Sequence, residues 1–262
     1  MAYSSIQLDV TDGLARVVLN QPALGNPFNE SFCDDWLTLS NELSSRTDVR
    51  AVLITANGKF FSVGGDIGMF ADNLDELPRL IKKWTSTLHV GIARMARLDA
   101  PIICAVHASA MGGAVALIAG TDLVYAARSA VLGSAYAGIG YSCDAGASFA
   151  LASRMGLARA RRFVLLAENL KAEQAQAAGL VDFVCDDADV LTQAEAMAKR
   201  LANGPTRAYG EIRRLFKSAL NQGFEAQLED EAQALSRVAG SPDAREGITA
   251  FVQKRKPQFR GQ

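Results

Sequence analysis

Two glycine-containing segments each lead from an apolar strand into a helix, and such junctions present backbone N–H groups to a ligand. One spans residues 61–67 around Gly65, and the other spans residues 111–114 around Gly113. Glycine allows a close approach to the backbone, and the N–H groups of a helix's first turn lack intrahelical acceptors. If the segments converge, Gly65 and Gly113 would form an oxyanion hole for a carbonyl that becomes an enolate or a tetrahedral oxyanion. On spacing alone, ordinary glycine turns explain both segments equally well.

Asp144 is the candidate acid–base group, because it is a carboxylate in a segment otherwise poor in charge between residues 129 and 153. In an apolar pocket, desolvation would raise the pKa of this carboxyl toward that of a useful general base. The sequence also places Asp144 at the start of a predicted helix, where an aspartate commonly caps the first turn. Without further information, capping is the stronger interpretation.

The remaining reactive side chains give weaker signals. His89 borders the apolar stripe of a predicted helix, where a partly buried histidine is more often structural than catalytic. Cys143 has no histidine adjacent in sequence to activate it, so we expect it to be a small buried hydrophobe. Because the chain has only two histidines and no metal-binding spacing, we predict no metal site.

The elements that would position these residues alternate in the manner of an α/β fold. A hairpin is predicted over residues 6–20, and buried strands over 51–55 and 102–106. Helices are predicted near residues 29–45, 77–98, 144–155, 158–166, 171–178, 188–202, 205–220, 223–238 and 242–254, with two short strands within 121–133. We therefore expect a mixed α/β body, an all-helical C-terminal third, and a division into a core of residues 1–200 and a helical subdomain of residues 201–262.

Composition narrows the classes of protein to consider. The 262 residues are 49% hydrophobic, which supplies a sizeable core and excludes disorder as the main state. The 27 Lys and Arg residues nearly balance the 28 Asp and Glu residues, so we expect no nucleic-acid partner. Widely spaced cysteines and the absence of a signal-peptide pattern favour a cytoplasmic protein.

One uncharged stretch, residues 102–120, approaches the length of a membrane-spanning helix. Pro101 precedes it and Gly112 and Gly113 interrupt it. A buried strand, a glycine turn and a buried helix therefore explain it better, and we expect no membrane partner.

Taken together, four stretches resemble the motifs of the crotonase superfamily of enoyl-CoA hydratases and isomerases. They are residues 23–28, 60–67, 101–113 and 245–259. The resemblance implies the crotonase-like (ClpP/crotonase) α/β fold, a spiral of ββα units with a helical C-terminal trimerisation region. It also implies an acyl-CoA thioester as substrate, a homotrimer or homohexamer, and no cofactor apart from the coenzyme A of the substrate.

The resemblance also assigns roles to individual residues. Gly65 and Gly113 correspond to the two backbone donors that hold the thioester carbonyl. The residues that match the CoA-binding turn are Ala23, Asn26, Val63, Gly64, Asp66 and Ile67. Phe251 and Lys254 match C-terminal residues that reach the CoA of a neighbouring subunit, where an ammonium group suits a phosphate.

The sequence lacks the two catalytic glutamates that are typical of the family's hydratases. Ala116 and Tyr136 stand where the family's hydratases carry two glutamates, so a conventional hydratase is not expected. Asp144 instead falls where some isomerases, among them those similar to epoxyphenylacetyl-CoA isomerases, keep an aspartate near the α and γ carbons of the substrate. The resemblance therefore favours catalysis over capping, with Asp144 moving a proton between those carbons while Gly65 and Gly113 stabilise the dienolate. Tyr136 could shape the pocket or donate a hydrogen bond.

Two alternatives stay open. The sequence is also similar to aryl-CoA dehalogenases, which pair a nucleophilic aspartate with a histidine base, and Asp144 and His89 fall at those positions. The same pair would serve a hydrolase that acts through an aspartyl ester. At the position of Tyr136, however, those dehalogenases carry a characteristic tryptophan. The other alternative is a non-catalytic CoA-thioester binder that kept the oxyanion hole. A buried Asp144 would count against the binder, whereas an Asp144 that caps a helix in solvent would favour it.

Overall fold

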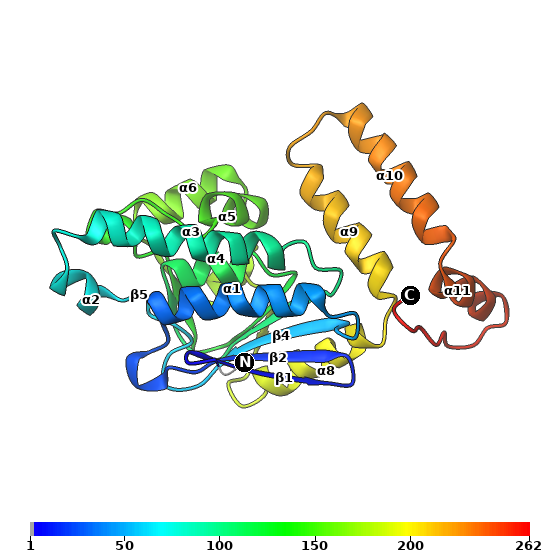
Figure 1. Ribbon diagram of the computed structural model, residues 1–262, viewed down its shortest axis with the longest axis horizontal. Helices are drawn as coiled ribbons and strands as arrows, with labels where there is room; N and C mark the ends of the chain where they lie inside the picture. The colour runs from blue at the N-terminus through cyan, green and yellow to red at the C-terminus, as the bar shows by residue number, and fades with distance from the viewer. Residues whose placement is uncertain (1–2) are drawn as a thin grey trace.

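A six-stranded sheet forms the centre of the computed structural model, which describes residues 3–262 (Figure 1). Its strand order is β1 (Ile6–Thr11), β2 (Leu14–Leu19), β4 (Ala51–Ala56), β6 (Ile102–Val106), β8 (Leu123–Ala127) and β11 (Phe183–Cys185). The β1–β2 hairpin is antiparallel, and every later neighbour pairs in parallel. β6 is buried along its whole length, as expected for a parallel strand covered on both faces.

Two smaller sheets lie outside this main sheet and contain the glycine segments. β3 (Pro27–Phe28) pairs in parallel with β5 (Gly64–Gly65). The second small sheet has the order β10 (Asn169–Lys171), β9 (Val131–Gly133) and β7 (Ala110–Met111). Each glycine segment is therefore fixed by its own short ladder of hydrogen bonds.

Helices cover the main sheet, and Figure 1 shows α1 and α8 on its opposite sides. Over residues 3–262, the helices are α1 (Glu30–Ser45), α2 (Ile67–Asp72), α3 (Leu77–Met95), α4 (Gly113–Ala119), α5 (Ala147–Met155), α6 (Leu157–Leu165), α7 (Ala172–Ala177), α8 (Val190–Ala202), α9 (Thr206–Ser218), α10 (Phe224–Ala239) and α11 (Pro242–Val252). α1 begins as the sequence predicts, with the Asn29 side chain accepting the Phe32 N–H at 3.0 Å. Its apolar stripe, which includes Trp36 and Leu39, is buried.

The prediction of an all-helical C-terminal third is wrong. β11 extends the main sheet beside β8, with Phe183 opposite Tyr125. β11 has three residues, as does β10, which lies just before that third of the chain. Such short strands carry too few apolar residues for their period to be visible, and pairing with a distant strand decides their conformation.

The uncharged stretch of residues 102–120 forms β6, β7 and α4, which confirms the predicted order of strand, glycine turn and helix. Within residues 3–262, no helix combines the length and the apolar character needed to cross a membrane. The stretch is apolar because most of its side chains are buried in the hydrophobic core.

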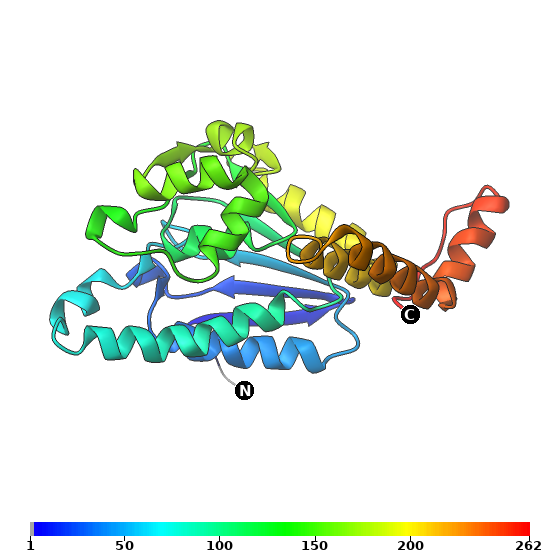
Figure 2. The ribbon, with the colours of Figure 1, turned by 90° about the horizontal axis from the view of Figure 1, so that it is seen from above.

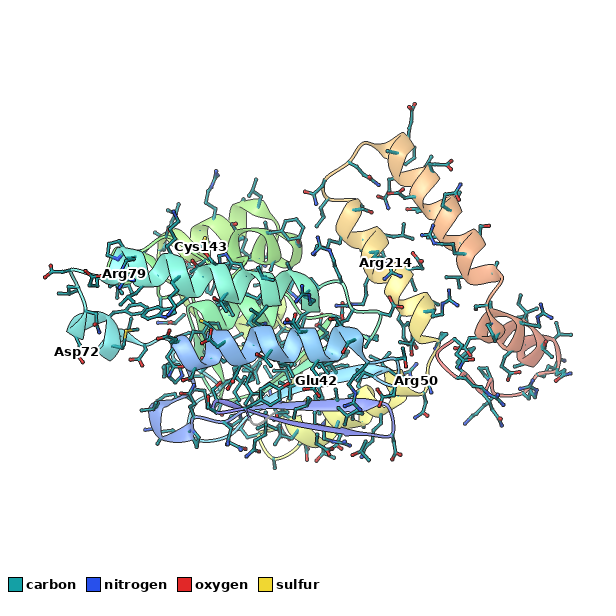
Figure 3. The ribbon with its side chains drawn as sticks, in the orientation of Figure 1. Glu42, Arg50, Asp72, Arg79, Cys143 and Arg214 are labelled. Atoms are coloured by element: carbon teal, nitrogen blue, oxygen red, sulfur yellow. The ribbon has the colours of Figure 1, made fainter. Side chains whose placement is uncertain are left out.

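The last three helices, α9 to α11, project away from the main body (Figure 2). Figure 3 shows Arg50 and Arg214 near the junction between the body and these helices. Arg50 donates to the carbonyl groups of Gly204 at 2.7 Å and Phe259 at 3.1 Å, and Arg214 pairs with Asp99 at 2.5 Å. The division predicted between residues 200 and 201 lies within the last turn of α8, just before the chain leaves the body.

Candidate active site

The two glycine segments lie against each other, as the sequence analysis anticipated. Ser62 bridges to Ala110 in parallel, and the Met111 N–H donates to the Ser62 carbonyl at 3.0 Å. Gly64 has a φ of 81°, and a Cβ atom there would lie 2.6 Å from the Met111 carbonyl oxygen. Only glycine permits so close an approach of the two backbones. The convergence on which an oxyanion hole depends is therefore confirmed.

Gly113 is the first residue of α4, so its N–H has no acceptor within the helix. A Cβ atom at Gly113 would lie 3.0 Å from the Phe28 ring and 3.7 Å from Asp144 Oδ1. Glycine thus leaves space between the start of α4 and the carboxylate. A substrate carbonyl bound at this N–H would have its neighbouring carbon atoms close to Asp144.

A cavity of about 620 Å³ brings together six of the predicted site residues. They are Val63, Gly65, Ile67, Gly113, Tyr136 and Asp144. The two glycines expected to donate to an oxyanion, a carboxylate and part of the expected CoA turn therefore line one cavity. Such a concave, mostly apolar site with few polar groups is typical of small-molecule binding.

Aromatic and aliphatic side chains from α2 and α3 form one wall of this cavity, and the sequence alone did not place them individually. The Phe70 ring stacks on Trp84 at a centroid distance of 6.4 Å and on Tyr141 at 6.0 Å. Leu77, Ile81 and Leu88 complete the α3 part of the wall. The apolar spacing of α3 was visible in the sequence, but this signal cannot distinguish a stripe that faces the core from one that also faces a cavity.

The Asp144 carboxylate is half-buried and faces this cavity. The Tyr136 hydroxyl donates to its Oδ1 at 2.9 Å, and no donor among residues 3–262 contacts Oδ2. Burial and the neighbouring Asp144 raise the pKa of the Tyr136 phenol, so the phenol stays protonated and acts as a donor. One carboxylate oxygen is thus held in place while the other is free for chemistry.

The interpretation of Asp144 as a helix cap is wrong. α5 begins at Ala147, its N-cap position is Gly146, and no side chain caps it. Ala145 and Gly146 have φ values of 52° and 78°, so the chain turns sharply between Asp144 and the helix. This turn directs the carboxylate toward the cavity instead of toward the N–H groups of α5.

Asp66 shows the opposite outcome. It occupies the N-cap position of α2, and its carboxylate accepts the Met69 N–H at 3.0 Å. Asp66 therefore caps α2, and it is not one of the residues that line the cavity. The assignment of Asp66 to a CoA-binding turn remains a prediction about this short loop.

The other residues of the expected CoA turn differ in accessibility. Asn26 is buried, and its amide nitrogen donates to the carbonyl groups of Asn57 at 2.8 Å and Phe61 at 3.1 Å. Its side-chain oxygen accepts the Gln21 N–H at 2.7 Å. The buried Asn26 side chain therefore stabilises the turn through hydrogen bonds to the backbone, whereas the Ala23 and Ile67 side chains are exposed to solvent.

His89 does not line the cavity of Asp144. It lines a second cavity, of about 720 Å³, together with Ala116. Its Nε2 atom accepts the N–H of Ala145 at 3.1 Å, which links α3 to the residue after Asp144. Cys143 is half-buried, and the structure shows no histidine bonded to it.

Phe251 and Lys254 lie at the end of α11, at the opposite end of the molecule from β5 (Figures 1 and 2). The Phe251 side chain is 84% exposed. Neither residue lines the cavity of its own chain. Among residues 3–262, no group of three or more His, Cys, Asp or Glu side chains is arranged to hold a metal ion.

Comparison with known proteins supports this picture. Residues 9–262 match the family model described as enoyl-CoA hydratase/isomerase. The chain is 34% identical to 1,2-epoxyphenylacetyl-CoA isomerase of Escherichia coli K12, over 96% of this chain and 97% of that protein. It is 31% identical to a protein named probable enoyl-CoA hydratase of Rhodobacter capsulatus, over the full length of both. A crystal structure of an enoyl-CoA hydratase from Polaromonas sp. JS666 has a TM-score of 0.92, with 28% identity and coverage of 98% of this chain and 100% of that one.

Proposed function

Because the chain belongs to the enoyl-CoA hydratase/isomerase family, we propose that it binds acyl-CoA thioesters and shifts their carbon–carbon double bond, with Asp144 as the single acid–base group. The observation that carries this proposal is the position of the carboxylate. Asp144 Oδ1 lies 3.7 Å from the point where a Cβ of Gly113 would be, inside a cavity that also contains Gly65.

In the proposed mechanism, the N–H groups of Gly65 and Gly113 bind the thioester oxygen. These hydrogen bonds strengthen as negative charge develops on that oxygen, so they make the α or γ proton more acidic. Asp144 Oδ2 removes this proton and leaves a dienolate. The same carboxyl group then returns the proton to the other carbon, which moves the double bond and restores the ionised aspartate.

Isomerisation is favoured over hydration because hydration needs both a base for water and an acid for carbon. Ala116 is buried and carries no proton-transfer group, and the pKa of Tyr136 is raised, which makes its phenol a poor acid. A single carboxylate suffices for a proton shift. The relatives are named both as isomerases and as hydratases, so this choice rests on the acid–base groups rather than on the names.

The two alternative functions receive less support from the geometry. A dehalogenase would require His89 to activate water at Asp144, but the Nε2 atom of His89 accepts the Ala145 N–H at 3.1 Å and the residue lines the second cavity. A non-catalytic binder would leave unexplained why Asp144 faces the cavity instead of capping α5.

We also propose a homotrimer or homohexamer, because α9 to α11 expose large apolar side chains. The most exposed are Phe216, Phe224, Leu235, Ile248, Phe251 and Val252, each at least 67% exposed. Large apolar side chains that are exposed in this number are typical of an interaction surface. In such an assembly, Phe251 and Lys254 would contact the CoA of a neighbouring subunit.

The decisive experiment is ultraviolet detection of conjugated 2-enoyl-CoA formed from a 3-enoyl-CoA. We expect wild-type protein to convert the substrate and Asp144→Ala to lower kcat by about 100-fold or more, because general acid–base catalysis contributes about 10²- to 10⁴-fold. Binding of the CoA thioester to both proteins is measured in parallel by calorimetry. Binding without conversion by wild type would refute the isomerase proposal, and full activity of Asp144→Ala would refute the role of Asp144.

A further inference from the structure

The residues that follow Asp144 adopt an unusual backbone. Ala145 has a φ of 52° and is only 2% exposed. A left-handed conformation is uncommon for alanine, and it persists where the surroundings hold it in place. Since Ala145 and Gly146 together turn the Asp144 side chain toward the cavity, whatever stabilises this conformation also determines where the carboxylate points.

His89 provides that support from a different element. It lies on α3, far from Ala145 in sequence, and its Nε2 atom accepts the Ala145 N–H at 3.1 Å. An imidazole nitrogen accepts a hydrogen bond only when it carries no proton, so this contact requires the neutral tautomer with its proton on Nδ1. Asp144 is therefore held on two sides, by Tyr136 at its carboxylate and by His89 at the next peptide group.

We propose that His89 is a positioning residue, which keeps Asp144 aimed at the substrate by accepting the Ala145 N–H. This inference rests on the proposed catalytic role of Asp144. His89 lines the second cavity with Ala116 and Ala145 and is not among the residues that line the cavity of Asp144, so we expect it to act through the Ala145 N–H and not on the acyl group. Its loss would consequently affect kcat and leave the KM for the thioester nearly unchanged.

Three substitutions of His89 separate positioning from proton transfer. Glutamine places its side-chain oxygen near the position of Nε2 and accepts a hydrogen bond, but it does not take up a proton. Asparagine is equally polar but too short, and leucine has no acceptor. We expect His89→Gln to keep kcat close to wild type, and His89→Asn and His89→Leu to lower kcat by about 10- to 100-fold, as displaced catalytic groups do.

The control is Val90→Ala, an exposed neighbour on α3 that lines neither cavity. Circular dichroism and thermal melting establish that each variant is folded. Because His89 is exposed, substitution is compatible with folding, and the comparison of the two amide variants remains available even if the leucine variant is unstable.

Two results would overturn the inference. If His89→Gln is as slow as His89→Leu, the imidazole itself takes part in the chemistry. If His89→Asn and His89→Leu both keep the wild-type kcat, the hydrogen bond to Ala145 does not position Asp144. Asp144→Asn, measured in the same assay, isolates the proposed function, because activity in that variant would refute the role of Asp144 whatever the His89 variants do.

Discussion

Asp66 and Asp144 show how the surroundings of a carboxylate determine its use. Both aspartates lie near a glycine and just before a helix. Asp66 accepts an N–H from α2, which leaves its carboxylate engaged in the helix cap. Two left-handed residues separate Asp144 from α5, and its carboxylate meets the Tyr136 phenol instead. Local backbone conformation thus converts a potential cap into a candidate acid–base group.

At the residue scale, we predict that Tyr136→Phe lowers kcat by about tenfold or more and changes KM little. A hydrogen bond to a charged group contributes about 1.5–3 kcal/mol, and its loss frees the carboxylate to rotate away from the substrate. Steady-state kinetics with a 3-enoyl-CoA measures the effect. The matched control is Tyr125→Phe, which removes the hydroxyl of another buried tyrosine, one that stacks on Phe183 in the main sheet. An equal loss of kcat in both variants would contradict the prediction.

At the element scale, short strands and caps hold the site together. β3 and β5 are two residues each, yet with the bridge from Ser62 to Ala110 they bring the two glycine segments into contact. Asn26 secures the connecting loop through hydrogen bonds to several backbone groups. The proposed oxyanion site therefore depends on backbone contacts between these segments and on the Asn26 side chain.

We predict that Gly64→Ala destabilises the protein by about 1–3 kcal/mol and also lowers kcat. Its φ of 81° is unfavourable for alanine, and the added Cβ would lie 2.6 Å from the Met111 carbonyl oxygen, so the segments must separate. Urea-induced unfolding monitored by circular dichroism gives the free energy of unfolding. Gly68→Ala serves as the control for stability, because Gly68 lies in α2 and its nearest neighbour would be 3.5 Å away. Equal stability of the two variants would argue against the close approach.

At the scale of the whole molecule, the body and the last three helices have different surfaces. The body buries a continuous apolar core, whereas α9 to α11 project from it and leave apolar side chains exposed (Figure 2). α9 is attached to the body by ion pairs of Arg213 with Asp122 at 2.8 Å and of Arg214 with Asp99 at 2.5 Å. These ion pairs thus hold α9 against the body, while apolar side chains of α9 to α11 remain exposed.

We predict that the double variant Phe216→Glu and Phe224→Glu converts the oligomer to a monomer. Both side chains are 76% exposed in the single chain, and burying a carboxylate in an apolar interface is strongly unfavourable. Sedimentation analysis measures the mass of each protein. Gln233→Glu, which adds a charge at an exposed polar position of α10, should keep the oligomer. A monomeric wild type would refute the assembly on which the role of Phe251 and Lys254 depends.

The sequence by itself determined the main elements, because each depends on local spacing. The β1–β2 hairpin, the Asn29 cap of α1 and the apolar run of β6 all follow from residues close together in the chain. The two glycine segments and the family resemblance likewise identified Gly65, Gly113 and Asp144 as candidates. Two of these sequence-based expectations are confirmed: membership of the family and the contact between the two glycine segments.

Only the tertiary structure determined which candidate residues line the same cavity. It placed Asp144 and Tyr136 in one cavity and His89 beside another, and it added the wall formed by Phe70 and Trp84. It also excluded the helix-cap alternative for Asp144 and revealed β11 in the main sheet. These features depend on contacts between residues distant in the chain and on the left-handed turn at Ala145. The periodicity of a sequence reports only neighbours along the chain, and it therefore does not encode them directly.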